Sequence, residues 1–266
     1  MAQHGLIRDA LGALPILGVL AAVYLLPPDT SLSEIRRAGA LPVCLPPDAP
    51  PFVAGDAKAP GIDVEILQAL ARDLGLWLAP VPEPAMGQDF NPRAWHVTRA
   101  ACAVLAGGLV ASPTTLSFLE MSPPYAQSGW ALLTPQPAAS SGAGHARKLG
   151  VLAPPSGLDR IALASRLRAE QAQVIIVSSA EALVAGLRAG RFEAGVTEKL
   201  LADQIAAREH WGADWLPGDL PHYPVAFGLW KGDLTLKRAV AGALERRMRD
   251  GTVAGILARY LGRGSP

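Results

Sequence analysis

The sequence is poor in cysteine and in charge, and both shortages narrow the classes of protein that it can encode. Two cysteines in 266 residues are too few for a disulfide scaffold or a structural zinc site. Charged residues make up only 18% of the chain, and a formal net charge of +1 leaves no basic surplus, so we expect no nucleic-acid partner. The 24 prolines and 27 glycines follow no period, which excludes collagen and solenoid repeats.

Signatures of nucleotide binding and of nucleophilic catalysis are missing as well. The chain has no G-x-x-x-x-G-K-[ST] segment and no G-x-S-x-G elbow, and Arg147 stands where a G-x-G-x-x-G motif beginning at Gly142 needs its third glycine. The five histidines include no pair at metal-ligand spacing. We therefore expect no metal and no cofactor. Binding is favoured over catalysis, with a glycosidase left open because carboxylates cannot be paired from sequence.

A long uncharged run at the N-terminus is the first feature that the sequence does have. No charge occurs between Asp9 and Asp29, and the apolar residues 10–26 approach the lower limit for a helix that spans a membrane. The run ends in Tyr24-Leu25-Leu26-Pro27-Pro28, which makes a poor signal-peptidase site. We expect residues 1–28 to be an uncleaved membrane anchor, with a cleaved signal as the alternative, and either one exports the rest of the chain.

Half of the residues are apolar, and beyond the N-terminus they recur in patterns typical of alternating strands and helices. Strands are expected at 41–45, 102–106, 130–134, 149–152, 173–177, 192–196 and 225–230. Helices are expected from 31, from 63 to 74, from 113, and at 158–169, 178–190, 198–209, 234–249 and 253–261. A low-complexity stretch at 135–144 divides this series. We therefore predict a two-lobed α/β fold with mostly parallel sheets, helices on both faces of each sheet and a ligand cleft between the lobes.

One strand end offers a candidate site for an anion. Gly107 and Gly108 close a predicted strand and let a ligand approach the backbone, and Ser112 then opens a helix. Free N–H groups and partial positive charge at such a helix start can hold a carboxylate. An ordinary connection between a strand and a helix is an interpretation of equal weight. Ser156 belongs to a similar but weaker helix start in the second lobe and is a further candidate ligand-binding residue.

Short motifs along the rest of the chain carry a family resemblance. In order, they are Leu41-Pro42-Val43-Cys44, Pro50-Pro51-Phe52, Gly61-Ile62-Asp63-Val64-Glu65, Ser122-Pro123-Pro124-Tyr125, Gly190-Arg191-Phe192-Glu193-Ala194, Lys231-Gly232 with Leu236, Asp250-Gly251-Thr252 and Tyr260-Leu261-Gly262. Their order and spacing resemble the extracytoplasmic solute-binding proteins of the polar-amino-acid type, which have the type II periplasmic binding fold. The resemblance covers residues 41–262.

This resemblance implies a domain organisation, a location and partners. Lobe 1 would comprise residues 39–133 and 223–266, and lobe 2 would comprise residues 134–222, with both lobes closing on the ligand. The implied ligand is a small polar organic solute, amino-acid-like or a carboxylate. The protein would capture it without catalysis for the inner-membrane permease of an ABC-type transporter. The implied location is the periplasm, with residues 10–26 holding the chain at the inner membrane.

The resemblance also points to ligand-binding residues on the walls of the cleft. Phe52 and Trp95 are the aromatic candidates, although Phe90 competes with Trp95 and burial in the core is the commoner fate of an aromatic residue. Glu198 matches the family acid that takes the α-ammonium group of the ligand. It fits equally well a solvated acid in the first turn of a helix.

The predicted cleft helix departs from the family where the ligand's α-carboxylate should bind. Ser112 matches the family's threonine, but Thr115 stands where the family has an arginine that grips the carboxylate. Without that charged pair, an α-amino acid should bind about 10-fold more weakly or worse. By the same reasoning, Thr115→Arg should strengthen amino-acid binding.

A second resemblance offers a different partner. Val43-Cys44, Cys102–Gly107 and Pro124–Ser128 resemble the branch associated with quinoprotein alcohol dehydrogenases, which implies a periplasmic quinoprotein dehydrogenase as partner in place of the transporter. A degenerate binding fold that serves only as an interaction module is a further alternative, because it would suit the missing arginine. In this fold Cys44 and Cys102 would lie in neighbouring strands, either as a disulfide or as two buried thiols.

Overall fold

The computed structural model describes residues 29–87, 92–135, 147–154 and 157–262 of the chain. Two compact units can be distinguished, residues 1–30 and residues 31–266, and the fold described below is that of the second unit. The membrane anchor expected at residues 1–28 lies outside the described residues. Within the described ranges, no helix is both long enough and apolar enough to cross a membrane.

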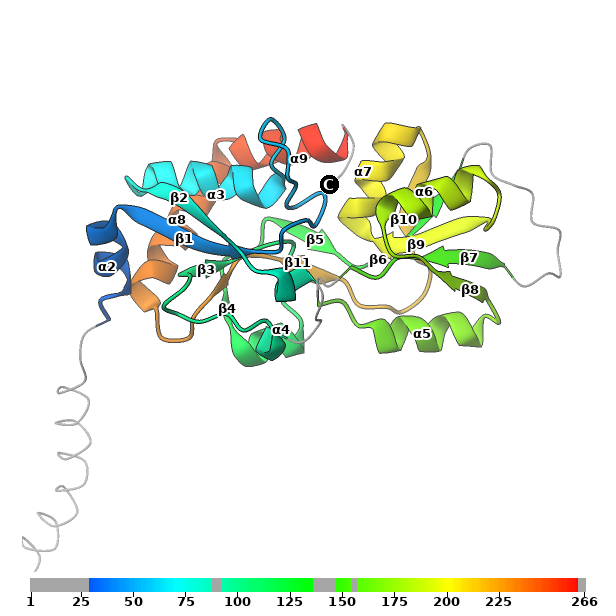
Figure 1. Cartoon of the computed structure of the whole chain (residues 1–266), viewed down its shortest axis with the longest axis horizontal. Coiled ribbons are helices and arrows are strands. Elements are labelled where there is room, and N and C mark those ends of the chain that lie inside the picture. The colour runs from blue at the N-terminus through cyan, green and yellow to red at the C-terminus, as the bar shows by residue number, and fades with distance from the viewer. Residues whose placement is uncertain (1–28, 88–91, 136–146, 155–156, 263–266) are drawn as a thin grey trace, which may run out of the picture. The chain divides into compact units, whose positions relative to one another are not determined.

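Short strands connected by helices make up unit 31–266 (Figure 1). Its strands are β1 (Ala40–Leu45), β2 (Trp77–Pro82), β3 (Val104–Leu105), β4 (Glu120–Met121), β5 (Ala126–Ser128), β6 (Trp130–Thr134), β7 (Lys148–Val151), β8 (Gln173–Ile176), β9 (Ala194–Glu198), β10 (Gly212–Trp215), β11 (Tyr223–Val225) and β12 (Gly228–Leu229). Its α-helices are α2 (Ser31–Ala38), α3 (Ile62–Asp73), α4 (Pro113–Phe118), α5 (Arg160–Ala169), α6 (Ala180–Arg188), α7 (Lys199–Glu209), α8 (Leu234–Arg249) and α9 (Thr252–Leu261). Two 3-10 turns follow β2, η1 (Pro84–Gly87) and η2 (Pro92–Ala94).

The strands form two five-stranded sheets and one two-stranded ribbon. The order is β2-β1-β3-β12-β4 in the first sheet and β10-β6-β9-β7-β8 in the second, and the ribbon consists of β5 and β11. All five residues of β9, the middle strand of the second sheet, are buried, as expected for a strand covered on both faces. This arrangement agrees with the predicted two-lobed α/β fold.

Each sheet is mixed, whereas we predicted mostly parallel sheets. β1 pairs in parallel with β2 and β3, and β7 pairs in parallel with β8 and β9. By contrast, β12 joins the first sheet antiparallel to β3 and β4, and β6 joins the second antiparallel to β9 and β10. With β6 and β12 the chain enters a sheet directly after leaving the other one. A strand–helix–strand crossover within one sheet makes its two strands parallel, but neither β6 nor β12 is reached by such a crossover. The alternating pattern of the sequence therefore does not show the direction of these two strands.

The chain passes between the sheets twice, and the two passages run side by side. It leaves the first sheet after β4 and reaches the second through β5, and it returns from β10 through β11 to β12. β5 and β11 pair antiparallel, with Ala126 opposite Val225. The predicted lobe boundary at 133/134 falls inside β6, whose residues all pair within the second sheet. Strand pairing therefore favours a boundary near β5, and the assignment of residues to lobes remains a proposal.

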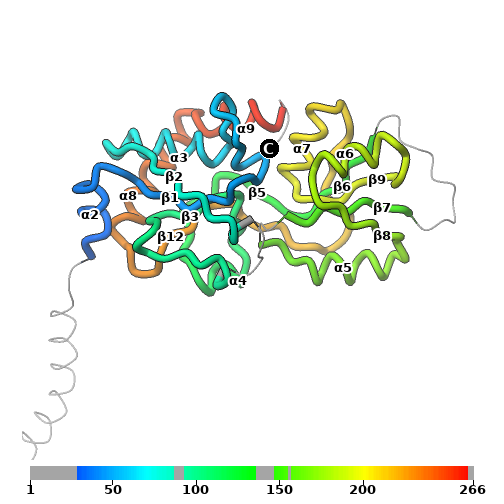
Figure 2. Tube along the Cα trace, viewed as in Figure 1, coloured from blue at the N-terminus to red at the C-terminus, as the bar shows by residue number. Residues whose placement is uncertain are grey.

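Helices cover both faces of each sheet (Figure 1 and Figure 2). α3 and α9 lie on one side of the first sheet and α4 on the other, while α6 and α7 lie across the second sheet from α5. The sequence of α3 explains how such a helix docks. It buries Ile62, Ile66 and Leu70, which are four residues apart and share one helical face, while Gln68 and Arg72 stay exposed.

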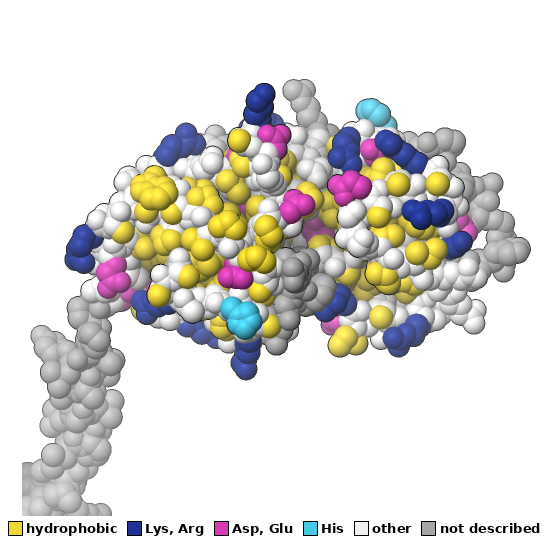
Figure 3. All heavy atoms as spheres, viewed as in Figure 1, with side chains coloured by type: hydrophobic (Ala, Val, Ile, Leu, Met, Phe, Trp, Pro, Cys, Tyr) yellow, Lys and Arg dark blue, Asp and Glu magenta, His cyan; other side chains and the backbone are white. Residues whose placement is uncertain are grey.

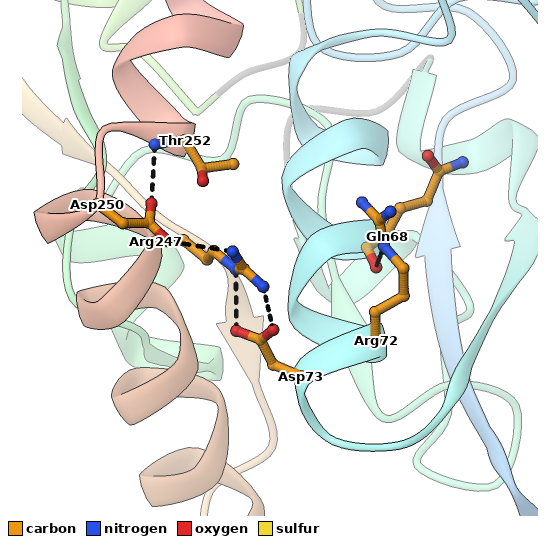
Figure 4. Close-up of polar contacts among 6 residues, drawn as sticks. All are labelled: Gln68, Arg72, Asp73, Arg247, Asp250 and Thr252. Atoms are coloured by element: carbon orange, nitrogen blue, oxygen red, sulfur yellow. Dashed lines mark hydrogen bonds and ion pairs between the residues drawn. The ribbon is translucent and has the colours of Figure 1, made fainter.

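The C-terminal helices return to the first sheet and are connected there to α3 (Figure 4). Arg247 of α8 donates two hydrogen bonds to the carboxylate of Asp73 at the end of α3. The same guanidinium donates to Asp250 Oδ2 at 3.0 Å. Asp250 Oδ1 in turn accepts the N–H of Thr252 at 2.9 Å, where α9 begins. One arginine thus ties together the ends of α3 and α8 and the start of α9.

Cys44 and Cys102 form a disulfide, and their Cα atoms lie 5.5 Å apart. The bond joins β1 to the residues just before β3. Both cysteines are buried in a cluster that includes Met86 and Trp95. Of the two arrangements that the sequence leaves open, the structure therefore has the disulfide.

Candidate functional site

A cavity of about 260 Å³ is lined by segments that follow strands of both five-stranded sheets. The described lining residues are Pro46, Asp48, Ala49, Pro50, Phe52, Met86, Gly107, Leu152, Ala153, Pro154, Ser178, Ser179, Ala180, Glu181, Glu198 and Leu201. They follow β1, β2 and β3, which are parallel, and β7, β8 and β9, which are also parallel. The crevice outside the carboxyl ends of parallel strands is where open α/β sheets bind their ligands.

The side chains that line this cavity give it a negative charge. Asp48, Glu181 and Glu198 line it, and none of the described lining residues is Lys, Arg or His. Asp48 and Glu181 are exposed, whereas Glu198 is buried. Figure 3 shows acidic side chains in the middle of one face of the unit. Sequence reasoning found Glu198 but missed the other two, whose only signal was their position just after the predicted strands at 41–45 and 173–177.

Glu198 caps a helix from the wall of the cavity. Its Oε1 accepts the N–H of Leu200 at 3.0 Å and the hydroxyl of Ser128, and its Oε2 accepts the N–H of Leu201 at 2.8 Å. These bonds occupy three of the roughly four acceptor positions of a carboxylate. Burial raises the pKa of Glu198, against the lowering effect of the three hydrogen bonds. Glu198 is therefore an acid at a helix start, as one interpretation predicted, but it is buried rather than solvated.

Glu181 lies in the first turn of α6, a helix that Ser179 caps. The Ser179 hydroxyl accepts the N–H of Ala182 at 3.2 Å. The Glu181 carboxylate accepts hydrogen bonds from its own N–H and from Ser179, and both bonds lower its pKa. Glu181 is therefore ionised at neutral pH.

The two glycines expected to receive an anion instead bind a carboxylate of the chain itself. Asp63 Oδ2 accepts the N–H groups of Gly107 and Gly108 at 2.7 and 2.9 Å, and Asp63 Oδ1 accepts the hydroxyl of Tyr125. Gly108 has a φ of 74°, and the ring of Phe52 lies where a side chain at position 108 would be. Burial raises the pKa of Asp63 and, together with the Asp63 carboxylate, raises the pKa of Tyr125. Both glycine N–H groups are thus taken by Asp63.

The structure brings three of the predicted site residues to the cavity, namely Phe52, Gly107 and Glu198. Ser112 caps α4 by accepting the N–H of Thr115 at 3.3 Å, which confirms the predicted helix start. Both side chains are buried, their hydroxyl oxygens lie 3.2 Å apart, and neither lines the cavity. The expected carboxylate site at this helix start therefore lies outside the cavity.

The remaining predicted site residues also lie away from the cavity or outside the described part of the chain. Trp95 is only 1% exposed and packs in the cluster around the disulfide. It is therefore a core residue, which was the alternative to a place on the cleft wall. Gly108 lies under the ring of Phe52. Ser156 and Phe90 lie outside the described residues.

A match to a family model shows which protein family this chain belongs to. The model for the bacterial extracellular solute-binding proteins, family 3, matches residues 41–263, a range that includes every lining residue named above. The chain belongs to this family. The resemblance found in the sequence is thereby confirmed, together with the solute-binding role and the extracytoplasmic location that it implied. The quinoprotein-associated branch is not addressed by this match and stays a prediction.

Solved structures of amino-acid-binding proteins share the fold of this solute-binding protein. An ancestral cationic amino-acid solute-binding protein has a TM-score of 0.70 at 21% identity, covering 87% of this chain and 99% of its own. An amino-acid ABC transporter substrate-binding protein from Streptococcus pneumoniae, bound to L-arginine, has a TM-score of 0.65 at 19% identity, covering 86% and 97%. At these identities the likeness shows the two-lobed fold alone. A search of curated proteins found no match.

One structural neighbour is linked to an enzyme. It is an ancestral amino-acid-binding protein described as a precursor of cyclohexadienyl dehydratase, with a TM-score of 0.67 at 21% identity, covering 87% of this chain and 99% of its own. Apart from this link, the structural neighbours named above are binding proteins.

Proposed function

We propose that this chain is a periplasmic substrate-binding protein that holds a small polar organic solute between its two lobes for an ABC-type transporter of the inner membrane. The observation that carries the proposal is the cavity of about 260 Å³, whose lining comes from the strand ends of both sheets. Cavities that bind drug-sized ligands usually measure about 300–1,000 Å³, so this one suits a smaller molecule. A solute held between two sheets that are connected by only two passages of chain would favour the closed arrangement of the lobes.

Isothermal titration calorimetry on the full chain in a non-ionic detergent tests solute binding. A panel of amino acids, organic acids and amines should contain at least one ligand with saturable binding. Ala153→Phe places a large ring in the cavity lining and should abolish that binding, whereas Ala57→Phe, which lies in a separate surface hollow, should preserve it. Equal binding by wild type and Ala153→Phe would place the ligand outside the cavity.

The proposal includes binding without chemical conversion. The absence of chemical conversion needs a test, because one structural neighbour is described as a precursor of an enzyme, cyclohexadienyl dehydratase. Three of the acceptor positions of Glu198 are engaged by the chain itself, which suits a structural acid better than a proton carrier. Mass spectrometry of the ligand after prolonged incubation with the protein should recover it unchanged, and any stoichiometric or catalytic product would contradict this part of the proposal.

Residues 10–26 are proposed to anchor the protein at the inner membrane, because the run is uncharged and has no good cleavage site. Fractionation of cells should place the full-length chain in the membrane fraction. Release of a shortened chain with the periplasmic fraction would favour a cleaved signal instead.

A periplasmic quinoprotein dehydrogenase remains a second candidate partner. The two cysteines that carry the resemblance to that branch are joined in the structure, as neighbouring strands in the fold allow. A purified quinoprotein alcohol dehydrogenase should then co-elute with the chain in gel filtration. Co-elution by a chain that binds no solute would favour this partner, or a pure interaction module, over the transporter.

A further inference from the structure

The cavity offers no cation to a negatively charged ligand. Its charged lining residues are Asp48, Glu181 and Glu198, and no described lining residue is basic. Residues 88–91 and 155–156, which follow the lining residues Met86 and Pro154 in the chain, contain no Lys, Arg or His in their sequence. A carboxylate in this cavity would therefore meet only charges of its own sign.

Two backbone donors beside the cavity are also engaged. Asp63 occupies the N–H groups of Gly107 and Gly108. The start of α4 does not reach the cavity, because Ser112, Pro113 and Thr114 line a separate hollow. Gly157 lies close to the Thr115 hydroxyl, since a Cβ atom at position 157 would be 3.2 Å from Thr115 Oγ1. Of the groups expected to bind a carboxylate, the two glycine N–H groups are used by Asp63 and the helix start lies outside the cavity.

The remaining lining suits an organic cation. The carboxylate of Glu198 has about one acceptor position left after its three internal hydrogen bonds. Apolar side chains make up much of the wall, among them Phe52, Met86, Leu152 and Leu201. A cationic group beside an aromatic ring and a carboxylate is favoured over a neutral one.

We propose that the cavity selects a small organic cation that lacks a carboxylate, an amine with its ammonium group toward Glu198 and its apolar part against Phe52, Met86 and Leu201. This inference rests on the proposed function, because it names the solute class of the same site. It differs from the amino-acid-like or carboxylate ligand that the family resemblance implied. An α-amino acid carries the same ammonium group but adds a carboxylate for which the cavity has no partner.

Matched pairs of ligands that differ by one carboxylate test the selection. Titration of the full chain in non-ionic detergent would compare cadaverine with L-lysine, agmatine with L-arginine and 2-phenylethylamine with L-phenylalanine, with glutarate as the acid probe. We expect at least one amine to bind, and to bind about 10-fold or more tightly than its parent amino acid. Tighter binding of an amino acid than of its amine, or binding of glutarate, would overturn the cation inference and leave the proposed function intact. Binding of no member of the panel would overturn both.

Neutral variants of the three acids connect the selection to the cavity. Asp48→Asn and Glu181→Gln are at exposed positions and should each weaken amine binding by about 2- to 5-fold, as expected for exposed ion pairs. Glu198→Gln should weaken it by about 10-fold or more, because the lost charge is buried. Glu170→Gln, an exposed acid of the second lobe outside the cavity, is the matched control and should change nothing. Unchanged affinity in both Asp48→Asn and Glu181→Gln would contradict the proposal even if Glu198→Gln fails to fold.

Discussion

Two buried carboxylates in this protein are bound mainly by the backbone. Asp63 takes the N–H groups of Gly107 and Gly108, and Glu198 takes two N–H groups at the start of α7. Each also receives one hydroxyl, from Tyr125 or Ser128. Hydrogen bonds favour the ionised form of a carboxyl group and burial opposes it. The pKa of each acid is raised, so burial has the larger effect at both sites.

The raised pKa of Asp63 predicts a pH-dependent stability. An acid whose native pKa exceeds its unfolded value binds more protons in the folded state between the two values, so the free energy of unfolding falls as the pH rises through this interval. Asparagine has nearly the same shape, and its oxygen can accept both glycine N–H groups while its amide donates to Tyr125. Urea unfolding from pH 4 to pH 8 should therefore show that Asp63→Asn gains stability relative to wild type as the pH rises.

The control for this measurement is Asp63→Ala. It leaves the buried N–H group of Gly108 and the partly buried N–H group of Gly107 unpaired, so it should lower the free energy of unfolding by about 2 kcal/mol or more. A relative stability of Asp63→Asn that stays constant or declines toward pH 8 would show that the native pKa of Asp63 is not raised.

Thr115 behaves differently in the structure from what the family resemblance implies. The resemblance predicts that Thr115→Arg strengthens amino-acid binding, but the Thr115 side chain is buried and Gly157 approaches its hydroxyl. A guanidinium placed there would be desolvated without a carboxylate partner, so we expect Thr115→Arg to lose about 3 kcal/mol or more of stability and to gain no amino-acid affinity. Thermal unfolding and calorimetry measure both, with Thr115→Ser as the control that keeps the Ser112 contact. A stable Thr115→Arg protein with new affinity for an α-amino acid would contradict this.

Long amphipathic elements of this chain could be predicted from the sequence, and short or irregular ones could not. The helix predicted at 234–249 has those bounds in the structure, and the strand predicted at 130–134 does as well. β2 was missed because it contains Pro80 and Pro82, which an edge strand tolerates. β4 and β5 have two and three residues, too few to show a period of two.

The disulfide between Cys44 and Cys102 fastens β1 to the segment before β3. Their separation of 58 residues closes a long loop, and the chain-entropy model gives about 4 kcal/mol of stabilisation for such a loop. We expect the Cys44→Ala, Cys102→Ala double variant to lose about 2–4 kcal/mol of stability. Chemical denaturation of the wild type with and without a reducing agent checks the same quantity. A double variant as stable as the oxidised wild type would show that the disulfide adds no net stability.

The position of the cavity at the strand ends could be predicted, but its charge could not. An α/β pattern in two runs places a cleft at the strand ends, and the predicted site residues Phe52, Gly107 and Glu198 line the cavity there. The sequence does not show that Asp63 consumes the N–H groups of the glycines, because this contact joins residues 44 and 45 positions apart. It likewise does not show that Asp48 and Glu181 line the same cavity. Side-chain contacts between distant segments are what the periodicity of a sequence leaves undetermined.

A ligand that touches both lobes should stabilise them together. At a free ligand concentration of about 100 times Kd, binding adds about 2.7 kcal/mol to the folded state. Since each kcal/mol raises Tm by about 2–4 °C in a domain of this size, the best amine of the panel should raise Tm by about 5–11 °C. Calorimetric unfolding should show one transition that moves as a whole, because the cavity lining comes from both sheets and two passages of chain connect them. Ala153→Phe should show no shift with the same amine. Two separate transitions, of which the amine moves only one, would mean that the solute binds a single lobe and that the cavity between the sheets is not where it is held.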